Sequence, residues 1–233
     1  MTHPPYPGPP TAPDAFPPQQ HPGPPQISRG FNPASGLAYA AMAAAGLFTL
    51  FEIVEAGFAF AAQDDYVEAS RQDLDAVDVL TAYDLVAIPW TLIVIATYVI
   101  SCLWLSQVRT NAEHLEPGAP HARGRGWVWG SWIVPVVNLW FPFQVVRDIA
   151  KRPNSPAPGR LLGWWWVFWL VYIISSRIGP SLTSFGEISP AISALGAVES
   201  VNAGFCAAAF VLWLAVITHI RRGQKASASE RQV

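Results

Sequence analysis

Four long apolar runs dominate the sequence and limit how the chain can fold. They span roughly residues 36–62, 84–107, 161–178 and 191–219. Each run is close to or above the ~18–20 residues that a helix needs to cross ~30 Å of hydrocarbon. A backbone in lipid satisfies its hydrogen bonds only as a helix or a closed barrel, and the runs do not alternate between apolar and polar residues. We therefore predict an all-α, polytopic membrane helix bundle with four transmembrane helices.

The low proportion of charged residues agrees with a chain that lies mostly in lipid. Hydrophobic residues make up 52% of the sequence and charged residues 13%, whereas a typical soluble domain has about 25% charged residues. This composition argues against a soluble enzyme. The basic residues lie in short loops next to the apolar runs, which argues against nucleic acid as a partner. The bilayer itself, and anionic lipids at its cytoplasmic face, are the natural partners of such loops.

A fifth apolar stretch, residues 126–146, is long enough to span but is interrupted by Pro135, Asn138 and Pro142. Short loops rich in Lys and Arg face the cytoplasm, and basic residues flank this stretch on both sides. If the stretch crossed the membrane, eight of the 14 Lys and Arg residues would move outside. We therefore predict a re-entrant or interfacial segment. This topology places both termini in the cytoplasm and the protein in the plasma membrane of the cell.

The two ends of the chain differ from the membrane domain, which we place at residues 35–222. Residues 1–34 contain twelve of the 22 prolines. This segment cannot bury enough apolar surface to fold, so we predict a disordered cytoplasmic tail and no cleaved signal. Proline-rich segments favour the polyproline II conformation that many recognition domains bind, so a protein partner of this tail is one hypothesis. Residues 223–233 are predicted to form a second disordered cytoplasmic tail.

Polar side chains within the apolar runs are the main candidates for a functional site. Ionisable groups in spans cost ~2.5–3.5 kcal/mol each on insertion scales, and they usually face a bundle interior or a wet cavity. Six residues fall at a similar depth in the outer half of the predicted bundle: Glu52, Glu55, Asp84, Arg177, Glu199 and Asn202. Three interpretations stay open: a wet outer interface, a structural lock that pairs Arg177 with Glu55 or Glu199, and a pathway for protons or cations.

Tryptophans and small residues are both distributed unevenly. Of the 11 tryptophans, only Trp90 falls clearly toward the outer half of the predicted topology. An aromatic belt at the headgroup boundary is one interpretation. A groove for a lipid or an aromatic ligand, between the re-entrant segment and the third span, is the other. Small residues such as Gly36, Ala40 and Gly196 follow the first and last runs. They favour close packing of these two helices, with a homo-oligomer face as the alternative.

The stretch from residue 105 to 169 carries the most distinctive motif, with SQVRTNAEHL, then GWVWGSWIVPVVNLWFPFQVVRDI, and then GWWWVFW. This pattern resembles the bacterial membrane protein family known as domain of unknown function 4328. The matching positions include Arg109, Asn111, Trp129, Pro135, Asn138, Trp140, Pro142, Gln144 and Arg147. Members often have a basic residue and a tyrosine around the second proline, where this chain has Phe141 and Phe143. The resemblance implies a multipass membrane fold and supplies no reaction, substrate or catalytic residue.

Signatures of enzymes are missing from the sequence. It has no H-E-x-x-H, G-x-S-x-G or G-x-x-x-x-G-K-[ST] motif, so we lean against an enzyme. Cys102 and Cys206 lie in apolar runs, and neither has the neighbours that a disulfide framework or a metal site needs. We expect no cofactor and no metal. The remaining hypotheses are a scaffold or interaction protein, or a lipid-sensing membrane protein. The alternative is a small transporter or channel that uses the acidic cluster.

Overall fold

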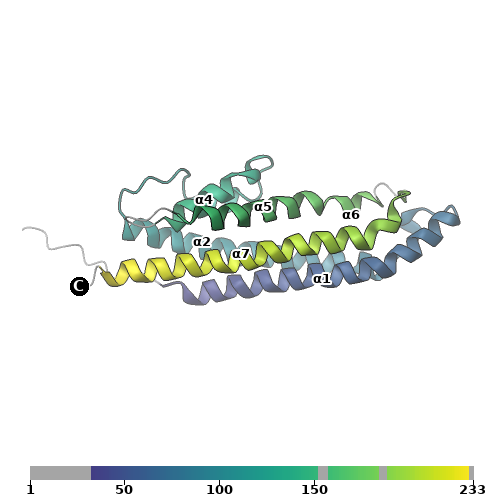
Figure 1. The fold of residues 1–233 in the computed structure, drawn as a ribbon, viewed down its shortest axis with the longest axis horizontal. Helices are drawn as coiled ribbons and strands as arrows, with labels where there is room; N and C mark the ends of the chain where they lie inside the picture. The colour runs from purple at the N-terminus through teal and green to yellow at the C-terminus, as the bar shows by residue number, and fades with distance from the viewer. Residues whose placement is uncertain (1–32, 152–156, 184–187, 231–233) are drawn as a thin grey trace, which may run out of the picture.

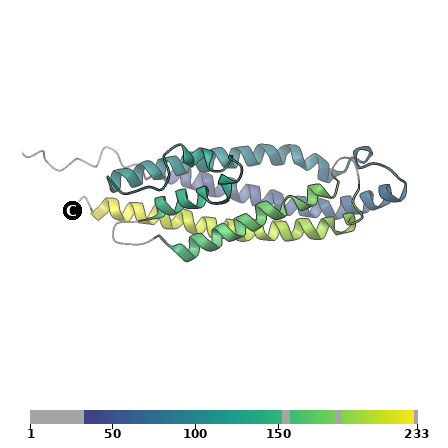
Figure 2. The same cartoon turned by 90° about the horizontal axis from the view of Figure 1, so that it is seen from above.

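Four long helices lie side by side along the long axis of the molecule (Figure 1, Figure 2). The computed structural model describes residues 33–151, 157–183 and 188–230, and no strand occurs in these ranges. The long helices are α1 (Ser35–Arg71), α2 (Ala82–Leu115), α5 (Gly159–Ser175, followed by the short helix α6, Ile178–Ser181) and α7 (Leu195–Glu230). The four corresponding helical segments are long and apolar enough to cross a membrane. The prediction of an all-α membrane bundle with four spans is therefore confirmed.

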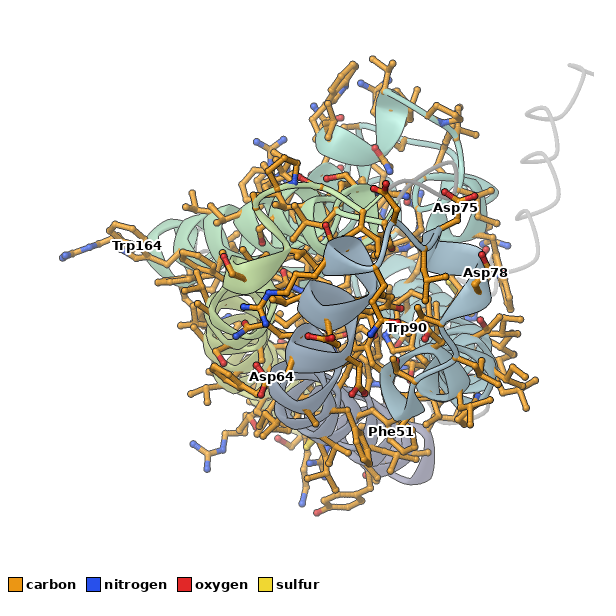
Figure 3. All side chains as sticks on the ribbon, turned by 90° about the vertical axis from the view of Figure 1, so that its right-hand side faces the viewer. Phe51, Asp64, Asp75, Asp78, Trp90 and Trp164 are labelled. Carbon is orange, nitrogen blue, oxygen red and sulfur yellow. The ribbon has the colours of Figure 1, made fainter. Side chains whose placement is uncertain are left out.

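The two ends of the bundle differ in charge. The basic end holds the start of α1, the end of α7 and the loop after α2 that contains Arg123 (Figure 1). The acidic end holds the connection between α1 and α2, with the short helix η2 (Ala76–Asp78), and the residues before α7, with η5 (Ile192–Ala194). Figure 3 looks onto the acidic end, where the labelled acidic residues are Asp64, Asp75 and Asp78.

α1 is longer than its apolar run predicts. The expected span ends at residue 62, but the helix continues to Arg71. Its 37 residues correspond to about 55 Å at 1.5 Å per residue, well beyond the ~30 Å hydrocarbon core. Tertiary contacts explain the extension, because Tyr66 is buried and its hydroxyl donates to Asp84, near the start of α2, over 2.8 Å. α1 and α2 thus stay paired beyond the apolar run.

The proline-broken stretch forms a hairpin that packs against the basic half of the bundle (Figure 1). It contains α3 (Trp127–Gly130), η3 (Val137–Leu139) and α4 (Phe141–Ala150). The backbone N–H of Ala122, before the hairpin, donates to the buried carboxylate of Asp148, in its last turn, over 2.6 Å. Because this bond joins its two ends, the hairpin enters and leaves at the basic end. The hairpin is not among the four helical segments that are long and apolar enough to span, and the prediction of a re-entrant or interfacial segment at residues 126–146 stays a prediction.

α1 and α7 share the most extensive helix–helix interface in the bundle. At Gly196 the two helices approach so closely that an added Cβ would overlap the ring of Phe60. Ala59 and Ala203 are also buried. Small residues therefore allow close packing of the first and last spans, as predicted. Gly36 lies outside this contact, with no neighbouring atom within 4 Å of an added Cβ, and the homo-oligomer face stays a prediction.

α7 continues to Glu230, eight residues beyond the predicted end of the membrane domain. The prediction of a disordered tail is therefore wrong for residues 223–230. The side chain of Gln224 explains the difference, because it donates to the Val108 carbonyl over 2.7 Å and accepts from Asn111 over 3.3 Å. Packing against α2 thus stabilises a helix end that has little apolar surface of its own. The predicted tail before residue 33, and residues 231–233, lie outside the described residues.

Candidate functional site

A partly open cavity of about 720 Å³ lies between the four long helices and the hairpin. All four long helices contribute to its walls, and the hairpin lines one side with residues between Trp132 and Leu139. Most of the lining side chains are apolar or aromatic, such as Phe48 and Trp169. Sites for small molecules usually have volumes of ~300–1,000 Å³ and mostly apolar walls. The cavity therefore has the size and the lining of a ligand site.

Tryptophans join the hairpin to α5 around this cavity. Trp132 packs edge-on against Trp169, with ring centroids 6.3 Å apart. Trp166 donates its indole N–H to the Leu139 carbonyl over 3.0 Å. Residues of the hairpin and of α5 both line the cavity, and the groove for a lipid or an aromatic ligand stays a prediction. Trp164, in contrast, projects away from the bundle (Figure 3) and is 57% exposed, as a residue of an aromatic belt would be.

The hairpin tip has a strained backbone next to the cavity. Val136 has φ 65° and ψ −49°, and the Val137 N–H donates to the Pro135 carbonyl over 2.7 Å. These values describe a γ-turn with a positive φ at its central residue, which is a rare and costly conformation for a β-branched side chain. Asn138, two residues later, lines the cavity. Strain of this kind accumulates at ligand clamps and switch regions.

Glu52 of α1 accepts hydrogen bonds from each of the other three long helices. Its Oε1 accepts from Trp90 Nε1 of α2 over 2.7 Å and from the Tyr172 hydroxyl of α5 over 2.9 Å. Its Oε2 accepts from Asn202 Nδ2 of α7 over 3.3 Å. We call these four residues the Glu52 hub; Figure 3 labels Trp90, which points into the bundle. Glu52 is only 5% exposed, and the three donors compensate for the cost of burying its carboxylate.

Two further predicted residues lie close to the hub. Glu199 accepts from the Tyr83 hydroxyl over 3.1 Å. Its carboxylate lies directly against Gly179, where an added Cβ would overlap it. Glu55 is half-buried and interacts electrostatically with both Glu52 and Glu199. The acidic residues of α1 and α7 are therefore brought together, as their similar depth suggests.

Asp84 and Arg177, the remaining two charged residues of the predicted cluster, form no hydrogen bond with the Glu52 hub. Asp84 forms a capping box with Thr81 at the start of α2, which satisfies N–H groups that the first helical turn leaves unpaired. Arg177 follows α5, is exposed, and lines the cavity. No carboxylate in the described part of the chain lies within 4 Å of its guanidinium. The lock that pairs Arg177 with Glu55 or Glu199 is therefore not formed, and neutral donors stabilise Glu52 instead.

A second polar network joins the hairpin to α2 at the basic end. Arg109 is 4% exposed. Its Nε donates to Glu113 over 3.0 Å and its Nη2 donates to the Arg123 carbonyl over 2.7 Å. Arg123 Nε donates in turn to Gln144 Oε1 of α4 over 2.8 Å, and Arg125 also pairs with Glu113. The buried guanidinium thus holds the loop before the hairpin in place.

Arg109 and Gln144 of this network, and much of the hairpin, belong to the motif seen in the sequence. A family model described as "Domain of unknown function (DUF4328)" matches residues 67–222. The chain belongs to this family. No curated protein and no solved structure matches the chain significantly. The DUF4328 match includes the hairpin and the three donors of the Glu52 hub, but it begins after Glu52 itself.

Other DUF4328 motif residues stabilise the hairpin and α2. Asn111 is fully buried beside Gln224. Trp129 donates its indole N–H to Ser106 over 3.1 Å. Pro142 lies in the first turn of α4, where a missing N–H costs nothing because it would have no helical partner. These motif positions therefore have structural reasons for their residue types.

Two phenylalanines of α4, Phe141 and Phe143, each lie against the guanidinium of an arginine. The Arg123 guanidinium is 3.6 Å from the centroid of the Phe141 ring, and that of Arg147 is 5.8 Å from the Phe143 ring. Trp140 packs against Phe141, with centroids 5.9 Å apart. Cation–π contacts contribute about 0.5–1 kcal/mol each at exposed sites. The two rings thus help to hold the guanidinium groups of Arg123 and Arg147 in place.

His121 lies in the loop before the DUF4328 hairpin, near Arg109. Neither of its ring nitrogens has a hydrogen-bond partner among the described residues, and both are buried. Burial, and then the positive charge of Arg109, lower the pKa of His121 below its usual value. The folded loop therefore favours the neutral imidazole.

Several residues of the site are not predicted by sequence patterns. Trp90 and Tyr172 lie in apolar runs, where aromatic side chains usually serve only packing. Asp148 belongs to the motif but lies outside the spans, so nothing indicates that its carboxylate is buried. An aromatic residue with a polar tip, at the depth of an acidic residue in another span, is the signal that points to such donors.

Proposed function

We propose that this protein is a lipid-sensing membrane protein that binds one acyl chain in its cavity. A single observation carries the proposal, namely the apolar cavity of about 720 Å³ between the four long helices and the hairpin. Its walls are aliphatic and aromatic at a depth that the predicted topology surrounds with lipid. Acyl chains are the apolar molecules that a bilayer supplies in the largest amount.

The hairpin offers a route from the cavity to the basic end. Trp132 and Leu139 line the cavity, while Gln144, farther along the hairpin, bonds to Arg123 in the preceding loop. An acyl chain in the cavity would therefore contact the hairpin, which is the segment that positions this loop. The strained turn at Val136 lies between Ile133 and Asn138, which both line the cavity.

Native mass spectrometry of protein released from nanodiscs tests the cavity as a lipid site. Ala45 lines the cavity, whereas Ala43, two residues earlier on α1, is exposed. Ala45→Phe should fill the cavity and remove a co-purifying lipid that the wild type and Ala43→Phe both retain. Ala209→Leu, a smaller change in the α7 wall, provides a second filling variant if Ala45→Phe folds poorly. Equal lipid retention in all variants would contradict the proposal.

The alternative functions have less support from the geometry. A small transporter or channel needs an accessible acidic group, but Glu52 is buried and already accepts from three donors. Proton and cation flux in proteoliposomes tests it, and unchanged flux in the double variant of Glu52→Gln and Glu55→Gln rejects it. The scaffold hypothesis depends on the tail of residues 1–34, nearly all of it outside the described residues, and stays a prediction.

A further inference from the structure

We propose that the occupant of the cavity is an amphiphile with an anionic head group, which Arg177 binds; this inference rests on the proposed function. Arg177 is the only charged residue among the described residues that line the cavity. Its side chain is exposed, and no described carboxylate lies within 4 Å of it. An arginine at membrane depth normally has a partner. The charge is therefore available to a ligand.

The length of the cavity fits one acyl chain. Its lining residues on α5 and just after it run from Trp165 to Arg177. Arg177 follows Trp165 by twelve positions, which corresponds to about 18 Å at 1.5 Å per residue. One leaflet contributes about half of the ~30 Å hydrocarbon core, which is a similar depth. At the end of the cavity remote from Arg177, Trp165 stacks on Trp213 with ring centroids 4.9 Å apart. The methyl end of the acyl chain would therefore contact an apolar surface.

Charge complementarity selects the head group. Glu52, Glu55 and Glu199 do not line the cavity, and Glu52 is already surrounded by its three donors. An anion at Arg177 therefore meets the guanidinium and not these carboxylates. A phosphate or a carboxylate would suit the guanidinium, since both accept paired N–H donors.

Quenching of tryptophan fluorescence by lipids with brominated chains tests the head group. Nanodiscs of phosphatidylcholine would carry brominated phosphatidylglycerol, brominated fatty acid or brominated phosphatidylcholine at the same mole fraction. The difference in quenching between the wild type and Ala45→Phe, whose cavity is filled, is the part that arises from lipid in the cavity. For this part we expect a preference for the anionic lipids over phosphatidylcholine on the order of threefold to tenfold. Arg177→Gln should abolish this preference, and Arg177→Lys should keep most of it.

Arg71→Gln is the matched control. Arg71 is also an exposed arginine toward the acidic end, but it pairs with Glu68 over 3.3 Å and does not line the cavity, so its loss should leave the preference unchanged. A preference for phosphatidylglycerol identifies a phosphate, and one for the fatty acid a carboxylate; either supports the proposal. Equal quenching by anionic and zwitterionic lipids, or a preference that survives Arg177→Gln, overturns the head-group assignment. If Ala45→Phe removes no quenching at all, the proposed function itself fails.

Discussion

The hydroxyl of Tyr172 donates a hydrogen bond to Glu52 over 2.9 Å, although 120 residues separate the two in the sequence. The same carboxylate oxygen also accepts from Trp90. Apolar helices gain little hydrophobic free energy from association within lipid, so packing and interhelical hydrogen bonds must hold them together. A single carboxylate that joins all four long helices therefore sets their relative depth.

Glu52→Gln should destabilise the bundle. The amide oxygen of glutamine can still accept from Trp90 and Tyr172, but its NH₂ group then faces the Asn202 amide nitrogen, and the charge is lost. Hydrogen bonds to charged groups contribute about 1.5–3 kcal/mol, so we expect the free energy of unfolding to fall by about 1–3 kcal/mol. Titration with sodium dodecyl sulfate in mixed micelles measures this change. Glu55→Gln, at a half-buried residue outside the hub, should change stability by less than about 0.5 kcal/mol; similar losses in both variants would contradict a specific role for the hub.

Gly179→Ala should also destabilise the protein, because the new Cβ would overlap the Glu199 carboxylate. Overpacking costs about 1–3 kcal/mol, whereas alanine in place of an exposed helical glycine normally adds stability of up to ~1 kcal/mol. A double-mutant cycle with Glu199→Ala should remove most of the cost. Gly163→Ala, where no neighbouring atom lies within 4 Å of the new Cβ, is the control and should be neutral or stabilising. A cost that persists without the Glu199 side chain would show that the close contact is not the cause.

Val136→Gly should stabilise the protein by about 1 kcal/mol. Glycine relieves backbone strain of about 1–3 kcal/mol at a positive φ, and its greater freedom in the unfolded chain offsets about 0.5–1 kcal/mol of this gain. Val136 is 65% exposed, so the substitution removes little burial. Thermal unfolding in detergent measures the effect. Val134→Gly, whose position has no positive φ, should destabilise the protein, and a loss of equal size at both positions would argue against strain.

Acidification should weaken the loop before the hairpin through His121. The pKa of His121 is lowered in the folded state by burial and by Arg109, so the unfolded chain binds a proton more readily. The contribution of the neutral imidazole is fully present above the unfolded pKa, near 6.5, and decreases as the pH falls below it. Unfolding temperatures at pH 7.5 and 5.5, compared with those of His121→Gln, measure this contribution. A pH response of the same size in the variant would exclude His121 as its source.

The sequence patterns and the structure agree where local physics decides the outcome. Length and hydropathy are sufficient for the four spans, and the basic residues on both sides of residues 126–146 are sufficient to predict that both ends of the hairpin lie at the same end of the bundle. The extensions of α1 to Arg71 and of α7 to Glu230 depend on the bonds of Tyr66 and Gln224 to α2. Such bonds exist only once the helices have packed, so periodicity and composition do not reveal them.

The candidate site also has one part that the sequence predicts and another that depends on how the helices pack. The similar depth of Glu52 and Asn202 follows from their positions in the first and last runs, and the structure bonds them together. Depth alone does not tell which way a side chain points around its helix. Arg177 therefore lines the cavity instead of pairing with Glu55, and Tyr172 reaches the carboxylate from a helix whose composition indicates only packing.

The position of Glu52 in the chain has a consequence for biosynthesis. Asn202 follows it by 150 residues, and at ~5–20 residues per second this delay is on the order of ten seconds. Trp90 follows by only 38 residues, so it is the first donor that emerges from the ribosome. We therefore expect the nascent α1–α2 pair to hold the carboxylate in lipid with one of its three partners, and α5 and α7 to add the others as each is inserted. On this expectation, the first two helices are the template on which the last two assemble.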